Sequence, residues 1–146
     1  MYGDARRERS YMQATIINEN NSEAFLGAVD TESLVNSDLF FGAVDEKSDA
    51  AVGVLAVGAG GNHTLAIRFI YVDEEYRRQG AGSSMLSLLT EVAYDMEAEA
   101  IVCALFISEE ELEIRDFLLA YGFLESESEE DDMVLLTYDL LKESLE

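Results

Sequence analysis

The chain has 146 residues, 49% of them hydrophobic, and its 31 acidic residues against 9 basic ones give a formal net charge of −22. This length predicts one domain with a substantial core, and no apolar run approaches the roughly 20 residues that span a bilayer, so we expect no membrane association. Such acidity argues against binding to nucleic-acid backbones, and one histidine and one cysteine argue against a metal site or an internal disulfide. The lone Cys103 suits a reducing, cytoplasmic compartment.

The acidic surplus has three interpretations that the sequence leaves open. It can form a solvated surface that keeps the protein in solution, it can line a groove that selects a cationic acceptor, or it can attract a basic protein partner.

The N-terminal half predicts strands separated by polar or glycine-rich turns. Residues 1–10 hold three of the nine basic residues and show no periodicity, so we expect a disordered arm or residues added for expression, followed by a folded domain at 11–146. A strand is predicted at 12–17, a short helix at 22–29 and a helical turn at Leu34 and Val35. Further strands are predicted at 39–44, 51–57 and 65–72, with turns at 45–49 and 58–61 and with His63 in a loop.

The C-terminal half predicts two helices that alternate with strands. Apolar residues at helical spacing indicate a helix at 84–96, and the apolar run 100–107 predicts a strand in which Cys103 is a buried small side chain. Ser108 and Glu111 match a capping box for a helix that ends at Gly122. An acidic hairpin loop is predicted at 125–132 and a last strand at 133–140. This order predicts an α+β fold with a mixed central sheet flanked by helices.

One junction between a strand and a helix carries the strongest functional signal. It contains adjacent arginines, Arg77 and Arg78, directly before Gly80 and Gly82, and no other basic residue follows until Arg115. Glycines let a ligand approach the backbone, and a helix N-terminus offers unpaired N–H groups and a positive dipole end. The junction therefore predicts an anion site of the kind that binds phosphate groups.

The same segment resembles the acyl-CoA-binding signature of the GNAT N-acyltransferase superfamily, [Arg/Gln]-x-x-Gly-x-[Gly/Ala], which reads Arg77-Arg78-Gln79-Gly80-Ala81-Gly82 here. Its flanks are also similar: Ile70-Tyr71-Val72 to the strand before the loop, Tyr76-Arg77 to a common Tyr-Arg pair, and Ala120-Tyr121-Gly122-Phe123 to the Gly-Phe that closes the next helix. The resemblance covers about residues 12–141 and implies a single GNAT-like, acyl-CoA-binding domain with a mostly antiparallel mixed sheet.

The resemblance implies that the loop and the start of the helix hold the pyrophosphate of acetyl-CoA or another acyl-CoA, chiefly through backbone amides. It implies that the preceding strand offers backbone groups to the pantetheine and one amide to the thioester carbonyl. The residues assigned to the cofactor in this way are Ile70, Tyr71, Val72, Arg77, Arg78, Gln79, Gly80, Ala81, Gly82, Ser83 and Ser84. No metal is implied.

The catalytic half of the family pattern is missing from the sequence. Many members keep a tyrosine as general acid four residues before the glycine of Gly-Phe, and Leu118 stands there. The strand before the loop also lacks the glutamate base that is often found in the family. The catalytic residues therefore stay unknown, with Tyr121 as a weak candidate and Tyr71 and Glu75 as further substitutes.

Three functions compete at this point. The first is an acyl-CoA N-acyltransferase that modifies an amine of a small molecule or a basic peptide, in a chain that could form a homodimer. The second is a catalytically weak CoA-binding module for sensing or assembly, which Leu118 favours. The third is a partner-binding domain without ligand, which the retained Arg77, Arg78, Gly80 and Gly82 disfavour.

Overall fold

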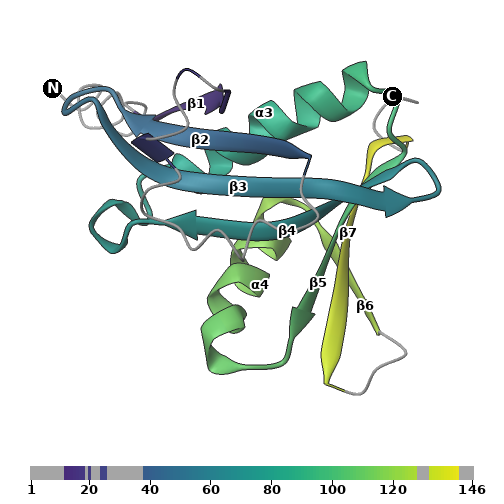
Figure 1. Ribbon diagram of the computed structural model, residues 1–146. Coiled ribbons are helices and arrows are strands. Elements are labelled where there is room, and N and C mark those ends of the chain that lie inside the picture. The colour runs from purple at the N-terminus through teal and green to yellow at the C-terminus, as the bar shows by residue number, and fades with distance from the viewer. Residues whose placement is uncertain (1–11, 19, 21–23, 26–37, 128–131, 142–146) are drawn as a thin grey trace, which may run out of the picture. The chain divides into compact units, whose positions relative to one another are not determined.

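Apolar, β-branched runs form the strands of this protein, and polar or glycine-containing turns separate them. The computed structural model describes residues 12–18, 20, 24–25, 38–127 and 132–141 (Figure 1). Within these ranges the elements are, in chain order, β1 (Met12–Ile16), β2 (Leu39–Asp45), β3 (Ala50–Gly61), β4 (Thr64–Val72), the 3-10 helix η2 (Glu74–Tyr76), α3 (Ala81–Asp95), β5 (Ala100–Phe106), α4 (Glu109–Tyr121), β6 (Leu124–Glu127) and β7 (Met133–Asp139).

The strands of the described residues form one seven-stranded sheet in the order β1-β2-β3-β4-β5-β7-β6. The pairs β1–β2, β2–β3, β5–β7 and β6–β7 are antiparallel, whereas β4 and β5 are parallel. The helix α3 makes the crossover that a parallel pair requires. The predicted α+β class and the mixed, mostly antiparallel sheet are therefore confirmed.

The described residues fall into two compact units, which divide β3, β4 and α3 between them. The first contains the described residues up to Val57 together with Arg68–Glu91, and the second contains Gly58–Ile67 and the described residues from Val92 on. In the first unit every residue from Val52 to Val57 is buried, which is typical of a strand covered on both faces. One face of β3 packs Val54 against Ile17 and Phe25. Phe41, Met85, Leu86 and Leu89 are also fully buried in this unit.

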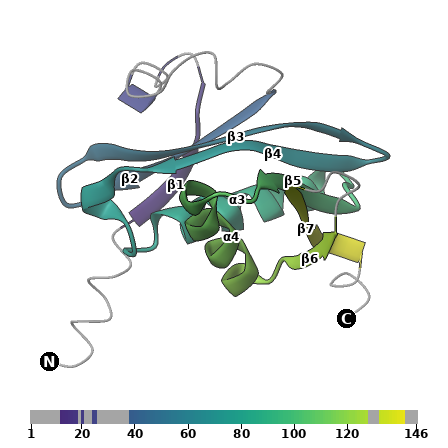
Figure 2. The ribbon, with the colours of Figure 1, turned by 90° about the horizontal axis from the view of Figure 1, so that it is seen from below.

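The second unit places α4 against β5 and β7, as Figure 2 also shows. Alternate residues of β5, namely Ile101, Cys103 and Leu105, are buried, as the period of two in a strand predicts when one face is covered. Leu118 of α4 and Leu136 of β7 are fully buried in the same core. None of the helices among the described residues is long and apolar enough to cross a membrane.

The glycine-rich segment 58–61 is not the turn that its composition predicts, because β3 continues through Gly61. The turn lies one step later, at Asn62 and His63, both with positive φ. A Cβ atom on Gly60 would lie 2.6 Å from Thr64 Oγ1 and 3.4 Å from the Ala66 Cβ. Glycine thus permits close approach within a strand here, which is one of its ordinary roles in sheets.

Helix α4 begins as predicted, but its capping box is rearranged. Ser108 accepts a hydrogen bond from the Glu111 N–H. The Glu111 carboxylate does not return to Ser108 but accepts a 2.7 Å hydrogen bond from the backbone N–H of Phe106 in β5. At the other end Gly122 has φ 130° and donates its N–H to Leu118 and Leu119, as a residue after a helix end commonly does.

Two further expectations need correction or fall outside the described ranges. Residues 124–127 form strand β6, which pairs with β7, so the predicted acidic loop at 125–132 begins too early. Glu125 tolerates its strand position because β6 is an edge strand and because the carboxylate pairs with Arg115 of α4. The predicted arm at 1–10, Leu34, Val35 and most of the predicted helix at 22–29 lie outside the described residues.

Candidate functional site

The predicted site residues 70–84 run from the end of β4 through η2 into α3, all within the first unit. At the strand end, the Arg77 Nε donates a 2.8 Å hydrogen bond to the carbonyl oxygen of Val72. The Arg77 guanidinium carbon also lies 5.9 Å from the centroid of the Tyr71 ring. The side chain of Arg77 therefore closes the loop onto its own strand.

Tyr71 is half-buried and stacks on Phe69, with 6.4 Å between the ring centroids. Its hydroxyl donates a 3.2 Å hydrogen bond to Asp73 Oδ1. Burial raises the pKa of Tyr71 above the ordinary tyrosine value, and the hydrogen bond and negative charge of Asp73 raise it further. Tyr71 is thus a neutral hydroxyl at neutral pH, held by a partner two residues along the chain.

Arg78 differs from Arg77 in conformation and in contacts. It has φ 64°, an uncommon value for a side chain other than glycine, and it is exposed. Among the described residues Arg78 has no hydrogen-bond or ion-pair partner. The next residue, Gln79, donates its side-chain N–H to the Glu75 carbonyl oxygen at 3.0 Å. Within the described residues nothing accepts a hydrogen bond from the Arg78 guanidinium, so its N–H donors are available to a ligand.

Helix α3 starts at Ala81, three residues before the predicted start at Ser84. Its first intrahelical bond runs from the Ser84 N–H to the Gly80 carbonyl at 2.9 Å. The N–H groups of Ala81, Gly82 and Ser83 precede that bond and so have no acceptor within the helix. Gly80, with φ 95°, turns the chain into this helix. The first turn of α3 contains no acidic residue, so its positive dipole end is not neutralised.

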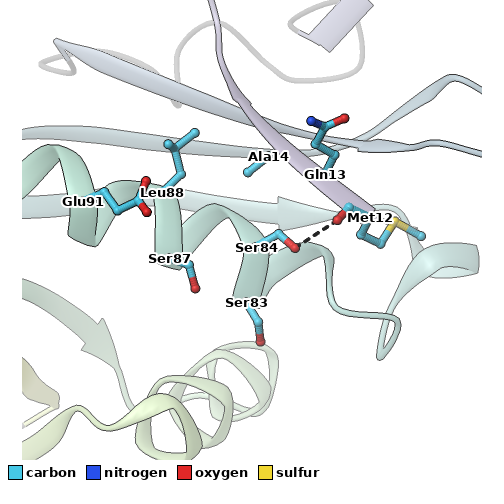
Figure 3. Close-up of a pocket in the computed structure, with 8 residues that line it drawn as sticks. All are labelled: Met12, Gln13, Ala14, Ser83, Ser84, Ser87, Leu88 and Glu91. Atoms are coloured by element: carbon cyan, nitrogen blue, oxygen red, sulfur yellow. Dashed lines mark hydrogen bonds between the residues drawn. The ribbon is translucent and has the colours of Figure 1, made fainter. Parts of the chain in front are cut away.

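The two serines at the start of α3 do different things. The Ser84 hydroxyl is half-buried and donates a 3.3 Å hydrogen bond to the Met12 carbonyl of β1 (Figure 3). Ser83 is exposed and points in another direction, as does Ser87 one helical turn later. Of the two predicted serines, Ser84 is thus engaged with β1, and Ser83 is the one placed to offer its hydroxyl to a ligand.

An open groove of about 410 Å³ lies between β1 and α3 next to these serines. Sequence reasoning did not identify this groove. The i, i+4 spacing of Ser83 and Ser87 could have suggested a shared polar strip on α3. Its lining residues are Met12, Gln13, Ala14, Ser83, Ser84, Ser87, Leu88 and Glu91.

Tyr121 and Leu118, the two positions of α4 considered for catalysis, have contacts that support the fold. The Tyr121 ring, in the second unit, packs against those of Tyr138 and Phe123, with centroid distances of 5.6 and 6.3 Å. Leu118 is fully buried and its carbonyl accepts hydrogen bonds that close α4. Glu75 is exposed in η2. No group of three or more histidine, cysteine or acidic residues in the described part of the chain is arranged to hold a metal ion.

Three solved structures illustrate the similarity of this fold to known proteins. An IAA acetyltransferase from Bacillus cereus is 16% identical, with a TM-score of 0.64, and the match covers 88% of this chain and 99% of that one. A ribosomal-protein-S5-alanine acetyltransferase from Vibrio fischeri is 13% identical, with a TM-score of 0.66 over 89% and 93% of the two chains. A candidate streptothricin acetyltransferase from Bacillus anthracis, solved in complex with acetyl coenzyme A, is 13% identical, with a TM-score of 0.67 over 86% and 95%.

No curated protein sequence matches the chain. The sequence model of the acetyltransferase (GNAT) family does match it, over residues 7–123. This match covers most of the chain and includes the whole strand, loop and helix of the candidate site. The protein therefore belongs to the GNAT family of acetyltransferases and has the fold of an acyl-CoA N-acyltransferase.

Proposed function

We propose that this protein transfers an acetyl group from acetyl-CoA to an amine of a cationic small molecule or a basic peptide. The part of this proposal that concerns acetyl-CoA binding rests on the start of helix α3. Its amides at Ala81, Gly82 and Ser83 precede the first intrahelical bond, and the first turn has no acidic residue. The chain has 31 acidic residues, and at this helix start unpaired N–H groups and the cation Arg78 can attract an anion.

Each predicted cofactor residue then has a distinct proposed role. Backbone N–H groups from Gly80 to Ser83 bind the pyrophosphate, and Arg78 and the Ser83 hydroxyl add direct contacts. Arg77 and Ser84 act indirectly, because their side chains hold Val72 and Met12. Gln79 likewise fixes the loop through Glu75. Ile70, Tyr71 and Val72 offer backbone groups to the pantetheine arm.

The reaction forms a C–N bond at the acyl carbonyl carbon and breaks the C–S bond of the thioester, while the amine loses a proton and the leaving thiolate gains one. The acceptor must attack as the free base, so a cationic acceptor predicts a rate that rises toward alkaline pH. The net charge of −22 supports a cationic acceptor, since it attracts such molecules over a distance of about 10 Å at 0.1 M salt.

The first experiment measures binding alone. Saturating coenzyme A, at about 100 times its dissociation constant, should add about 2.7 kcal/mol to the free energy of unfolding and raise Tm by roughly 5–11 °C. Arg78→Ala, through a roughly tenfold or larger loss of affinity, should remove about half of this shift or more. An unchanged Tm in the presence of coenzyme A, with calorimetry also showing no heat of binding, would refute the proposed cofactor site.

The second experiment asks whether the chain turns over. Polyamines, aminoglycosides, amino acids and basic peptides are offered with acetyl-CoA, and thiol release is followed. A Tyr121→Phe variant that loses activity while it keeps coenzyme A binding would make Tyr121 the proton donor.

A catalytically weak CoA-binding module is the second candidate, and the burial of Leu118 where family members carry a tyrosine favours it. Coenzyme A binding without turnover of any acceptor would select this alternative.

A further inference from the structure

The second unit exposes an apolar sheet face opposite the one that α4 covers. The register pairs Ala104 with Leu135 and Phe106 with Met133, so these four side chains share one face of β5 and β7. In β6, Leu124 lies opposite Thr137, and Thr137 lies opposite Val102, which extends the same face across a third strand. We define the open face as Ala104, Phe106, Leu124, Met133 and Leu135.

The open face is accessible as well as apolar. Phe106 is 56% exposed and Leu124 is 68% exposed, whereas the neighbouring residues Ile101, Cys103 and Leu105, on the opposite face of β5, are at most 5% exposed. Ser126 and Thr137, which share this face, are uncharged. Exposed apolar groups gathered across three strands mark an interaction surface more often than a solvent face.

The charge around the open face determines what kind of partner fits. Asp139 lies at one end of the face by its register, and Asp132 directly precedes β7 at the other. Between residues 92 and 146 the only basic residues are Arg115 and Lys142, and Arg115 already pairs with Glu125 and Asp116.

An apolar centre with an acidic edge matches a partner that has apolar side chains in its middle and lysine or arginine at its borders. A second copy of this chain fits poorly, because it would bring two acidic edges together. Three adjacent strands also suit a helix, since neighbouring strands are about 4.8 Å apart and a helix with its side chains is about 10 Å wide.

We propose that the open face docks a basic amphipathic helix of a partner protein. This surface is independent of the proposed coenzyme A site, because none of its residues takes part in that site. The proposal assigns binding to the sheet face itself, so affinity depends on Phe106 and Leu124 as well as on charge.

The test uses two synthetic 14-residue peptides with equal numbers of lysines and an N-terminal fluorophore. In one, leucines recur at i, i+3, i+4 and i+7 and form a continuous stripe; in the other, serines replace the leucines. Fluorescence anisotropy should show that the full-length protein binds the leucine peptide at least tenfold more tightly than the serine peptide. Affinity for the leucine peptide should fall as salt rises from 50 to 300 mM.

The double variant Phe106→Gln and Leu124→Gln should weaken leucine-peptide binding at least tenfold. The matched control Ile16→Gln changes a side chain that is 49% exposed in the other unit and should leave binding unchanged. Both variants should keep the Tm of the unmodified protein, because the altered side chains are about half exposed or more.

Three results would overturn the proposal. Equal binding of the two peptides would show attraction by the acidic surface alone. A Tm lowered by several degrees in the double variant would show that the chain itself already covers the face. Sedimentation that shows a dimer, which the double variant dissociates, would make a second copy the occupant.

Discussion

The Nε atom of Arg77 lies 2.8 Å from the carbonyl oxygen of Val72 and donates a hydrogen bond to it. The two residues enclose η2, so the side chain of Arg77 fixes the loop against the strand from which it leaves. Arg78, its neighbour, is exposed and has no partner among the described residues. Adjacent arginines of one motif thus have different surroundings.

This difference predicts that substitution of Arg77 lowers the stability of the fold, whereas substitution of Arg78 lowers the affinity for coenzyme A. Arg77→Ala should lower the free energy of unfolding by about 0.5–1.5 kcal/mol, because Val72 loses its donor. Arg78→Ala should leave stability within about 0.5 kcal/mol. It should weaken coenzyme A binding by a factor of about ten or more, because charge-assisted contacts to phosphate are lost. Urea unfolding and titration calorimetry on both variants test this, with Arg78→Lys as a control that retains charge. The opposite assignment of effects would show that Arg77 binds the phosphate.

The serines at the start of α3 form a second matched pair. Ser84→Ala should lower the free energy of unfolding by about 0.5–1.5 kcal/mol, because the carbonyl of the buried residue Met12 loses its donor. Ser83→Ala should leave stability nearly unchanged and weaken coenzyme A binding by roughly two- to tenfold. Thermal unfolding with and without coenzyme A measures both quantities. If Ser83→Ala has no effect on affinity, the backbone amides alone bind the phosphate.

Gly53 of β3 predicts a steric effect at the end of β4. A Cβ there would lie 3.0 Å from Met85 Cε and 3.1 Å from the Tyr71 carbonyl oxygen. The methionine methyl can move, but the backbone oxygen cannot move without shifting β4. Gly53→Ala should therefore destabilise the fold by about 1–3 kcal/mol and weaken coenzyme A binding as well.

Gly61→Ala is the control for Gly53→Ala, because its Cβ would meet nothing within 4 Å although its φ of +82° is unfavourable for alanine. It should cost about 1 kcal/mol of stability and leave coenzyme A affinity unchanged. Equal losses of affinity in both variants would show that general destabilisation, not the position of Tyr71, is responsible.

Cys103 predicts a stability that declines at alkaline pH. Burial raises the pKa of its thiol to about 12, and the negative charge of Glu111 adds to this effect. In the unfolded chain a thiol ionises near pH 8.5, so above that value the folded state binds more protons than the unfolded state. This contribution is fully present below about pH 8 and is lost as pH rises toward 12, by about 1.4 kcal/mol per pH unit.

The measurement compares urea unfolding of the unmodified protein and Cys103→Ala between pH 7 and pH 10.5. The difference in unfolding free energy should narrow as pH rises, because only the unmodified protein has the titrating thiol. A thiol reagent should also react slowly with the folded protein at pH 8. Parallel pH profiles for the two proteins would contradict the assigned pKa.

The alternation of apolar residues predicted most strands to within a few residues, because burial on one or both faces determines that pattern. It failed where glycine and acidic residues occupy strands. Residues 58–61 belong to β3, and at Gly60 the close approach of Thr64 and Ala66 requires the absence of a side chain. Glu125 belongs to β6 because an edge strand leaves its carboxylate free to meet Arg115. Tertiary contacts, which composition does not contain, determine both cases.

The candidate site could be predicted as a motif but not as a set of roles. Arg77-Arg78-Gln79-Gly80 indicates an anion loop, and the structure places these residues next to the start of α3. That Ala81, Gly82 and Ser83 already belong to the helix was missed, because glycine and serine are weak helix formers in isolation. The partners Val72 for Arg77 and Met12 for Ser84 depend on side-chain direction, which the spacing of residues does not specify.

The hydrogen bond between Ser84 and Met12 joins the first turn of α3 to an edge strand, since β1 has a neighbour on one side only among the strands that the structure describes. Local opening of β1 therefore removes a support from the helix end that is proposed to receive phosphate. Because binding free energies are reciprocal, a ligand that orders this helix end must also reduce the population of molecules in which β1 has opened. Coenzyme A should then slow the hydrogen exchange of amides in β1, a strand with no proposed contact to the cofactor.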